Sequence, residues 1–296
     1  MTRTINSVLV PTDGSEGAQV GARRGIDLAT TIGADLHVLS VIDSREIEPD
    51  LISNDQTERE QLLEEEAERA VDSIARLAHT HLSGRITTAV KSGIPFQTIN
   101  DYADTHDIDL IVMGSRGRTG FERLLLGSVA ERTLRTANVP IVMVAPDADI
   151  VEIGDQLYEN VLLPTDGSEG AELAIEWGTT IAEVYDATVH TLYSVETSRF
   201  GGVEGMAEIH DALEQTGRQA LETVQERARA ADISVTGNIA SGPAARTILA
   251  YSEEHDIDLI VMGTHGRSGL RRYLTGSVTE TVVRNASVPI CCVPMR

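Results

Sequence analysis

The sequence predicts two α/β domains of one fold, each a doubly wound, five-stranded parallel sheet of strand order 3-2-1-4-5 with helices on both faces. The chain has 296 residues, and domains usually contain about 100 to 200 residues, so there is room for two. Hydrophobic residues make up 41% of the chain but aromatic residues only 3%, which favours aliphatic cores of the kind that buried parallel sheets have. In both halves short apolar runs alternate with helical segments.

The second half of the chain repeats the first. The residues PTDGSEGA at 11–18 recur unchanged at 164–171, and HDIDLIVMG at 106–114 recurs at 255–263. Each half also ends in a similar V-P-I segment, at 138–146 and 287–294. We therefore predict a first domain at 1–148, a polar linker at 149–157 and a second domain at 158–296.

The elements of the first half can be read in order along the chain. Residues 5–10 form a short apolar run that ends in Pro-Thr-Asp-Gly, as a buried strand entering a loop does. Residues 18–32 are typical of a helix that stops at Gly33, and strand character resumes at 36–42. Apolar residues at three- and four-residue spacing over 63–77 predict a long amphipathic helix. A strand, a helix, a strand, a helix and a strand then follow at 86–90, 96–105, 110–113, 128–137 and 139–144.

The predicted strand order brings two loops together. In such a sheet, ligands bind at the carboxyl ends of the strands, where the order reverses between the first and fourth strands. The loop after the first strand contains Pro11, Thr12 and Asp13, and the loop after the fourth strand begins at Gly114. We expect these loops to face each other.

A glycine pattern follows the fourth strand in both halves. It reads G-x2-G-x9-G-S, with Gly114, Gly117, Gly127 and Ser128 in the first half and Gly263, Gly266, Gly276 and Ser277 in the second. Glycines let the backbone approach a phosphate closely, and the helix that follows presents N–H groups to an anion. The pattern indicates a phosphate-binding loop. The alternative is that the glycines serve only the geometry of a strand-to-helix turn.

With the PTDGS opening and the V-P-I final strand, this pattern resembles the ATP-binding universal stress proteins over nearly the whole chain. The resemblance implies that each half binds ATP, or ADP or AMP, and that any Mg²⁺ arrives with the nucleotide. It implies that Asp13 and Asp166 contact the ribose or base, and that the backbone near Val41 and Ser194 meets adenine. The other implied nucleotide-binding residues are Pro11, Thr12, Met113, Gly114, Arg116, Gly117, Gly127, Ser128 and Val129, and Pro164, Thr165, Met262, Gly263, His265, Gly266, Gly276, Ser277 and Val278.

Other polar residues fit structural roles better than catalytic ones. His106 and His255 lie before the fourth strand, at the edge opposite the ligands, so we favour a turn role over acid–base catalysis. Ser15 and Ser168 fit helix caps. Arg116 and His265 lie within the glycine loop, where they either touch phosphate or face solvent, and Arg118 and Arg267 are further candidates. The sequence contains neither a P-loop nor His and Cys residues at metal-ligand spacing, and no catalytic residue is predicted.

Charge narrows the functional classes. The formal net charge is −22, and Lys91 is the only lysine. Such an acidic chain repels nucleic acids and anionic membranes, and is typical of a cytoplasmic protein from a halophile. The N-terminus lacks the apolar core of a secretory signal, and no apolar run approaches a membrane span. Cys291 and Cys292, as neighbours on a strand, are predicted to be buried without forming a disulfide.

The leading functional hypothesis is a stress-response or signalling module that binds nucleotide at two pockets with little or no turnover. The alternatives are a slow ATPase or adenylate-chemistry enzyme on the same fold, and a scaffold that retains the glycines only for their geometry. The last strands, at 139–144 and 288–293, are apolar edges that must be covered. We expect them to pair within the chain as an internal pseudo-dimer, with a homodimer as a further option, and we expect the loops at 44–57 and 197–206 to determine partner choice.

Overall fold

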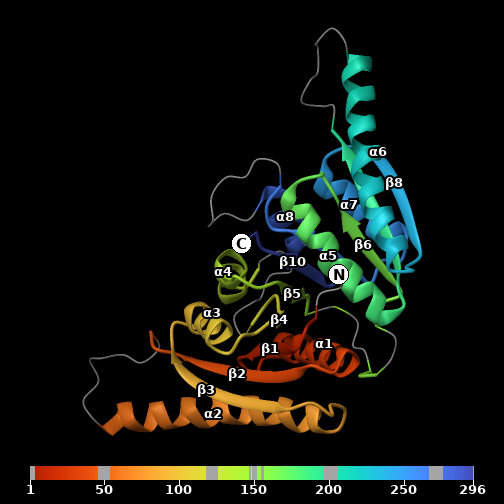
Figure 1. Ribbon diagram of the computed structural model, residues 1–296. Helices are drawn as coiled ribbons and strands as arrows, with labels where there is room; N and C mark the ends of the chain where they lie inside the picture. Colours follow the sequence, from red (N-terminus) through yellow and green to blue (C-terminus); the bar gives the residue numbers. More distant parts are fainter. Residues whose placement is uncertain are drawn as a thin grey trace. The chain divides into compact units, whose positions relative to one another are not determined.

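A computed structural model describes residues 4–45, 54–117, 126–146, 148, 152–154, 157–196, 206–266 and 276–295. The chain forms two compact units, Ile5–Asp155 and Gln156–Arg296, with the same succession of elements (Figure 1). The first unit contains β1 (Ser7–Thr12), α1 (Glu16–Ile32), β2 (Asp35–Asp43), α2 (Asn54–His79), β3 (Ile86–Gly93), α3 (Pro95–Thr105), β4 (Leu110–Gly114), α4 (Ser128–Thr136) and β5 (Ile141–Val144). The second contains β6 (Asn160–Pro164), α5 (Glu169–Tyr185), β7 (Thr188–Val195), α6 (Met206–Ala230), β8 (Val235–Ser241), α7 (Ala244–Glu254), β9 (Leu259–Gly263), α8 (Ser277–Asn285) and β10 (Ile290–Val293).

The strand order of the first unit is β3-β2-β1-β4-β5, and every neighbouring pair is parallel. The second unit has the matching order β8-β7-β6-β9-β10, again all parallel. The predicted order 3-2-1-4-5 is therefore confirmed. It sets the carboxyl ends of β1 and β4 side by side, as it does those of β6 and β9.

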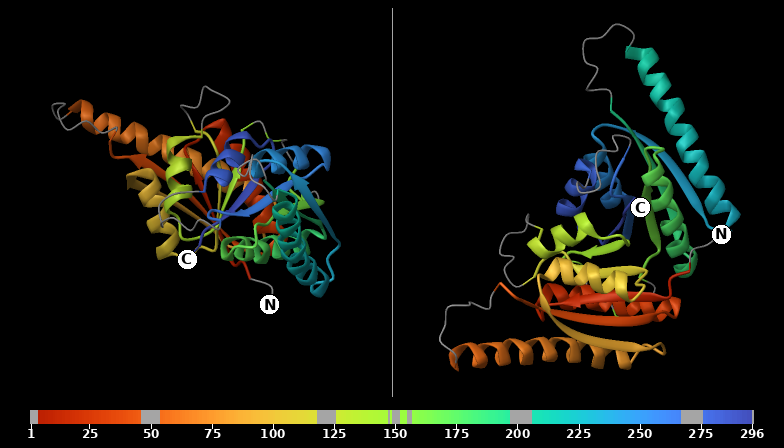
Figure 2. Two further views of the ribbon diagram at one scale, coloured as in Figure 1. Left: turned by 90° about the horizontal axis from the view of Figure 1, so that it is seen from above. Right: turned by 60° about the vertical axis from the view of Figure 1, so that its left-hand side comes forward.

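Helices cover both faces of each sheet. In the first unit α1 packs on β1 and β4 and α2 packs on β2 and β3, whereas α3 packs beside α4. The second unit repeats this arrangement with α5 and α6, and with α7 beside α8. The long helices α2 and α6 run alongside β3 and β8 (Figure 2). Among the described residues, no helix is long and apolar enough to cross a membrane.

The cores are aliphatic, as the composition predicts. The largest fully buried side chains are Leu and Ile residues, among them Leu9, Ile26 and Ile111 in the first unit. Cys291 and Cys292 are also buried, and neither forms a disulfide. Burial raises the pKa of the Cys291 thiol to about 12, so this side chain behaves as a small apolar group.

Most observed ends of the elements lie close to the predicted ones, and the start of α2 is the main difference. Helix α1 ends at Gly33, as predicted, because Gly33 adopts a left-handed φ of 72° and its N–H bonds back to the last turn. Strand β5 begins at Ile141, two residues later than predicted, because Pro140 has no N–H to give to the ladder. Helix α2 begins at Asn54, well before the apolar spacing that predicted it.

The repeated HDID residues hold the amino edge of each sheet. His106 and His255 follow the last residues of α3 and α7 as C-caps, in agreement with the predicted turn role. Asp109 Oδ2 accepts the backbone N–H groups of Asn6 at 2.8 Å and Ser7 at 3.2 Å. Asp258 binds the start of β6 in the same way. These carboxylates therefore satisfy donors at the entry to the central strand.

Candidate functional site

The loops after β1 and β4 meet, as the strand order predicts. A Cβ atom placed on Gly117 would lie 2.5 Å from Oδ2 of Asp13, and one on Gly266 would lie 2.7 Å from Oδ2 of Asp166. These distances are shorter than side-chain contacts allow. Any side chain at these positions would therefore displace the aspartate carboxylate.

The β1 loop is held in shape by its own side chains. Asp13 Oδ1 accepts the N–H of Ser15 at 3.0 Å, and Thr12 Oγ1 accepts the N–H of Gly14 at 3.1 Å. Ser15 caps α1 by accepting the N–H of Ala18 at 3.2 Å. The second half repeats all three hydrogen bonds, including the Ser168 cap of α5. One oxygen of each aspartate thus orders its loop, while the other lies against the glycine loop.

The glycine loop leads directly into the N-terminus of α4. The Gly127 N–H donates to the Ser115 carbonyl at 2.8 Å, and the Ser115 N–H donates to Val144 at 2.7 Å. The helix then starts at Ser128, and no side chain among the described residues caps it. Helix α8 begins in the same way after Gly276. Whereas α1 and α5 are capped by serines, α4 and α8 begin without a side-chain cap among the described residues and can offer N–H groups to an anion.

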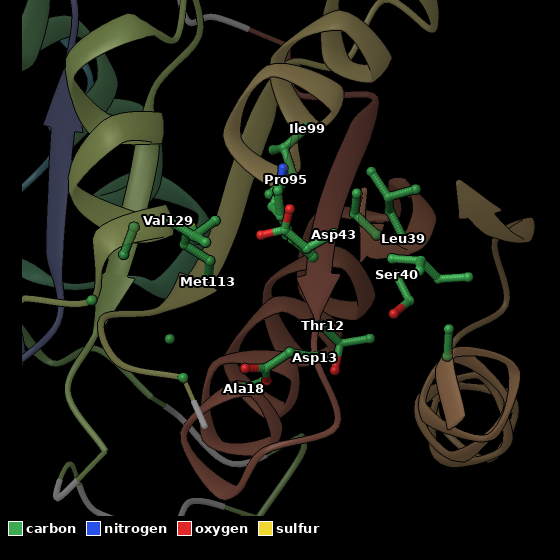
Figure 3. A pocket seen from close by; sticks show the side chains of 18 of the residues that line it. Thr12, Asp13, Ala18, Leu39, Ser40, Asp43, Pro95, Ile99, Met113 and Val129 are labelled. Atoms are coloured by element: carbon green, nitrogen blue, oxygen red, sulfur yellow. The ribbon is translucent and has the colours of Figure 1, made fainter. Parts of the chain in front are cut away.

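A cavity of about 360 Å³ lies between these loops in the first unit (Figure 3). All eleven residues that the sequence predicts for this half line it: Pro11, Thr12, Asp13, Val41, Met113, Gly114, Arg116, Gly117, Gly127, Ser128 and Val129. They come from the carboxyl ends of β1, β2 and β4 and from the start of α4. The cavity therefore lies at the edge of the sheet where doubly wound folds bind ligands.

One wall of the cavity is apolar. Pro95, Ile99, Met113 and Val129 gather on one side of it, and Asp13 lies apart from them (Figure 3). Sequence analysis did not single out Pro95 and Ile99. They could have been predicted from their position in the first turns of the helix after the third strand, because that helix starts at the same carboxyl edge of the sheet.

Asp43 and Arg45 also line the cavity and were not predicted. Arg45 Nε donates to Asp43 Oδ1 at 2.8 Å, and its Nη2 lies 2.5 Å from Oδ2. This hydrogen bonding holds the pKa of the Asp43 carboxyl below its ordinary value of 3.8. The pair adds a fixed negative and a fixed positive charge to the lining.

The second unit places its predicted residues at matching positions. Pro164, Thr165 and Asp166 follow β6, Met262 and Gly263 end β9, His265 and Gly266 follow, and Gly276, Ser277 and Val278 start α8. Strand pairing sets Pro11 opposite Leu39 and Pro164 opposite Leu192. Val41 lies two residues after Leu39, and Ser194 lies two residues after Leu192. The two residues therefore occupy equivalent positions in the two halves.

Two polar side chains distinguish the second half. Ser194 Oγ donates to the Gly242 carbonyl at 2.6 Å. His265, at the position of Arg116, bonds through Nδ1 to Thr264 Oγ1 at 2.9 Å, and its Nε2 is buried without a partner among the described residues.

Some predicted features lie beyond what the structure describes. Arg118, Arg267 and most of the loops at 44–57 and 197–206 fall outside the described residues. Within the described ranges, no group of three or more His, Cys, Asp or Glu side chains is placed to hold a metal ion.

Comparison with known proteins gives a consistent result. The sequence profile of the universal stress protein family matches residues 4–145 and again 157–294. A universal stress protein of Methanocaldococcus jannaschii is 37% identical over 147 residues, 49% of this chain and 86% of that protein. One of Mycobacterium bovis is 30% identical over 232 residues, 77% of this chain and 76% of that protein. The crystal structure of a universal stress protein from Archaeoglobus fulgidus shares the fold, with a TM-score of 0.72 at 24% identity over 98% of this chain and 96% of that one.

Proposed function

Because the chain belongs to the universal stress protein family, with two copies of its domain, we propose that each half binds an adenine nucleotide and that the protein acts as a stress-response module. The observation that carries the proposal is the cavity that unites all eleven residues expected to bind nucleotide in the first half. The same loop geometry in the second half supports a second site.

The glycine loop and α4 suit the phosphates. The N–H groups at the start of α4 lack a side-chain cap among the described residues, and the partial positive charge of a helix N-terminus attracts anions. Gly117 lets the loop lie close to its ligand, and Arg116 lines the same cavity. In the second half we assign the corresponding role to His265, whose Nε2 is buried and unpartnered among the described residues.

The apolar wall suits the base. Pro95, Ile99, Met113 and Val129 offer a surface of the kind that buries a planar ring. Val41, at the end of β2, can meet the polar edge of adenine through its backbone. We assign the Asp13 carboxylate, which lies against Gly117 and apart from this wall, to a ribose hydroxyl.

The lining favours binding over turnover. A general base must be able to take a proton from water. The carboxylate of Asp13 already accepts an N–H from Ser15, and that of Asp43 is bound by Arg45, which lowers its pKa. Glu66 is the third carboxylate in the lining, so slow ATP hydrolysis is the alternative that the test below must exclude.

The wider setting follows from charge and edge strands. Because the net charge is −22, we propose that the protein is adapted to high salt and has no nucleic acid or membrane partners. We place it in the cytoplasm, where ATP is supplied, and expect any Mg²⁺ to arrive bound to the nucleotide. Within its own unit the last strand pairs on one side, β5 with β4 and β10 with β9. We propose that these apolar strands pair as an internal pseudo-dimer, which slow hydrogen exchange of the β5 and β10 amides would support.

The proposal is tested site by site with calorimetry in high salt. A Gly127→Val variant is expected to lose one bound ATP and Gly276→Val the other, since each side chain would crowd the carbonyl that faces it. Phosphate release is measured on the same samples and should stay negligible. Rapid release would favour the enzyme, and a wild-type chain that binds no nucleotide would leave only the scaffold.

A further inference from the structure

The two halves differ at one position of their second strands. The equivalent prolines Pro11 and Pro164 each lie opposite a leucine, and the residue after that leucine is Ser40 in the first half and Tyr193 in the second. Equivalent positions on a strand face the same side of the sheet. A small hydroxymethyl group in one half is therefore replaced by a phenol ring in the other.

The helices beside these strands also differ, with the larger residue in the first half and the smaller one in the second. Ala78 of α2 and Ala228 of α6 are both fully buried, and the carbonyl of each accepts an N–H from the loop that follows. Eleven residues earlier, about three helical turns, stand Ala67 and Gly217. The larger strand residue thus goes with the smaller helix residue.

In the second half Tyr193 fills this space. Its side chain is 4% exposed and packs with Val195, Leu213 and Leu221. A Cβ atom on Gly217 would lie 2.6 Å from Cδ1 of Tyr193. The ring therefore lies directly against α6, where only a glycine leaves room for it.

In the first half the same space is open. Ser40, Leu63 and Ala67 line the candidate cavity together with Thr12, and Figure 3 shows Ser40 beside Leu39, away from the apolar wall. A second cavity of about 250 Å³ adjoins this part of the site, because Thr12 and Glu66 line both. It continues along α2 past Arg69 and Ser73.

We infer that the first-half site accepts an adenine nucleotide with a substituent on its ribose and that Tyr193 excludes such a ligand from the second-half site. The inference rests on the proposed function, in which Asp13 holds the ribose. Its neighbour Thr12 borders the open space between Ser40 and Ala67, so a group on a ribose hydroxyl can enter there. In the second half the same group meets the Tyr193 ring. ATP without a ribose substituent does not need the space between Ser40 and Ala67, so it binds both halves.

The test compares ATP with an analogue that carries an N-methylanthraniloyl group on a ribose hydroxyl. The full chain is titrated with ATP by calorimetry and with the analogue by fluorescence. We expect two ATP but one analogue molecule per chain. Two analogue sites of equal affinity would overturn the inference while leaving the proposed function intact, whereas absence of ATP binding would overturn both.

Each half supplies the matched control for the other. The Ser40→Tyr, Ala67→Gly double variant gives the first half the residues of the second, and should weaken analogue binding at least about tenfold while ATP still fills both sites. The Tyr193→Ser, Gly217→Ala double variant should create a second analogue site. Circular dichroism establishes that each variant is folded. If the Tyr193→Ser, Gly217→Ala variant does not fold, the Ser40→Tyr, Ala67→Gly variant alone tests the inference. Unchanged analogue binding to that variant would contradict it.

Discussion

Single glycine residues determine how closely the two loops of each site approach. Gly117 and Gly266 lie against the carboxylates of Asp13 and Asp166, at distances at which a methyl group would displace the carboxylate. In the proposed site the same glycines therefore serve both the fold and the ligand, because they keep the aspartate where we assign it to the ribose.

We predict that Gly117→Ala weakens ATP binding at the first site about tenfold, or ~1.4 kcal/mol. The added methyl group pushes the Asp13 carboxylate out of place. Calorimetry on the full chain measures the effect, and Gly266→Ala, which should weaken only the second site, is the matched control. Unchanged affinity in both variants would remove Asp13 and Asp166 from the site.

A second residue-level prediction concerns His37 and His190. Burial, together with the charge of a neighbouring histidine, lowers the pKa of each below its ordinary value of 6.5. The unfolded chain then takes up protons at a higher pH than the folded chain, so this contribution to stability is present above 6.5 and is lost as the pH falls below that value. The melting temperature should drop over this range, and less so in a His37→Gln, His190→Gln variant. An equal drop in the variant would assign the effect to other groups.

The residues of the site were predictable to different degrees. Asp13 and the glycines stand in repeated motifs, and both motifs lie beside strands whose order can be inferred. Pro95, Ile99 and Asp43 carry no motif, and they enter the cavity only because α3 begins, and β2 ends, at the same edge of the sheet. The contrast between Ser40 and Tyr193 requires the strand register, which sequence alone did not provide.

At the scale of elements, the two ends of each sheet have separate tasks. The carboxyl ends of β1 and β4 line the candidate site, whereas Asp109 holds the amino end of β1 and its counterpart Asp258 that of β6. Their motif is repeated as faithfully as the binding loop, so repetition alone cannot tell the two tasks apart. The position of a motif in the fold does distinguish them, because ligands of doubly wound sheets bind at the carboxyl edge.

We therefore predict that Asp109→Ala destabilises the fold without changing ATP affinity. Removal of the carboxylate leaves the N–H groups of Asn6 and Ser7 without their acceptor, at a cost of about 1–3 kcal/mol. Urea denaturation measures the cost, and Asp258→Ala should behave alike. A loss of ATP binding in a variant that remains folded would contradict this separation.

For the whole molecule, charge is the dominant property. The chain carries 46 acidic and 24 basic residues, so like charges repel across its surface. Salt shortens the Debye length from about 10 Å at 0.1 M to about 3 Å at 1 M, which screens this repulsion and the repulsion between the protein and the nucleotide that we propose it binds.

Stability should accordingly rise with salt. We predict a higher melting temperature in 2 M KCl than in 0.1 M KCl. Sodium sulfate at equal ionic strength separates screening from effects on apolar burial. A melting temperature that does not change with KCl concentration would argue against adaptation to high salt.

The most direct test of the account is the number of ATP molecules that the wild-type chain binds in high salt, measured by calorimetry. Two copies of the domain with equivalent glycine loops predict two ATP molecules per chain. A chain that binds none would show that the glycines serve only the turns between strand and helix.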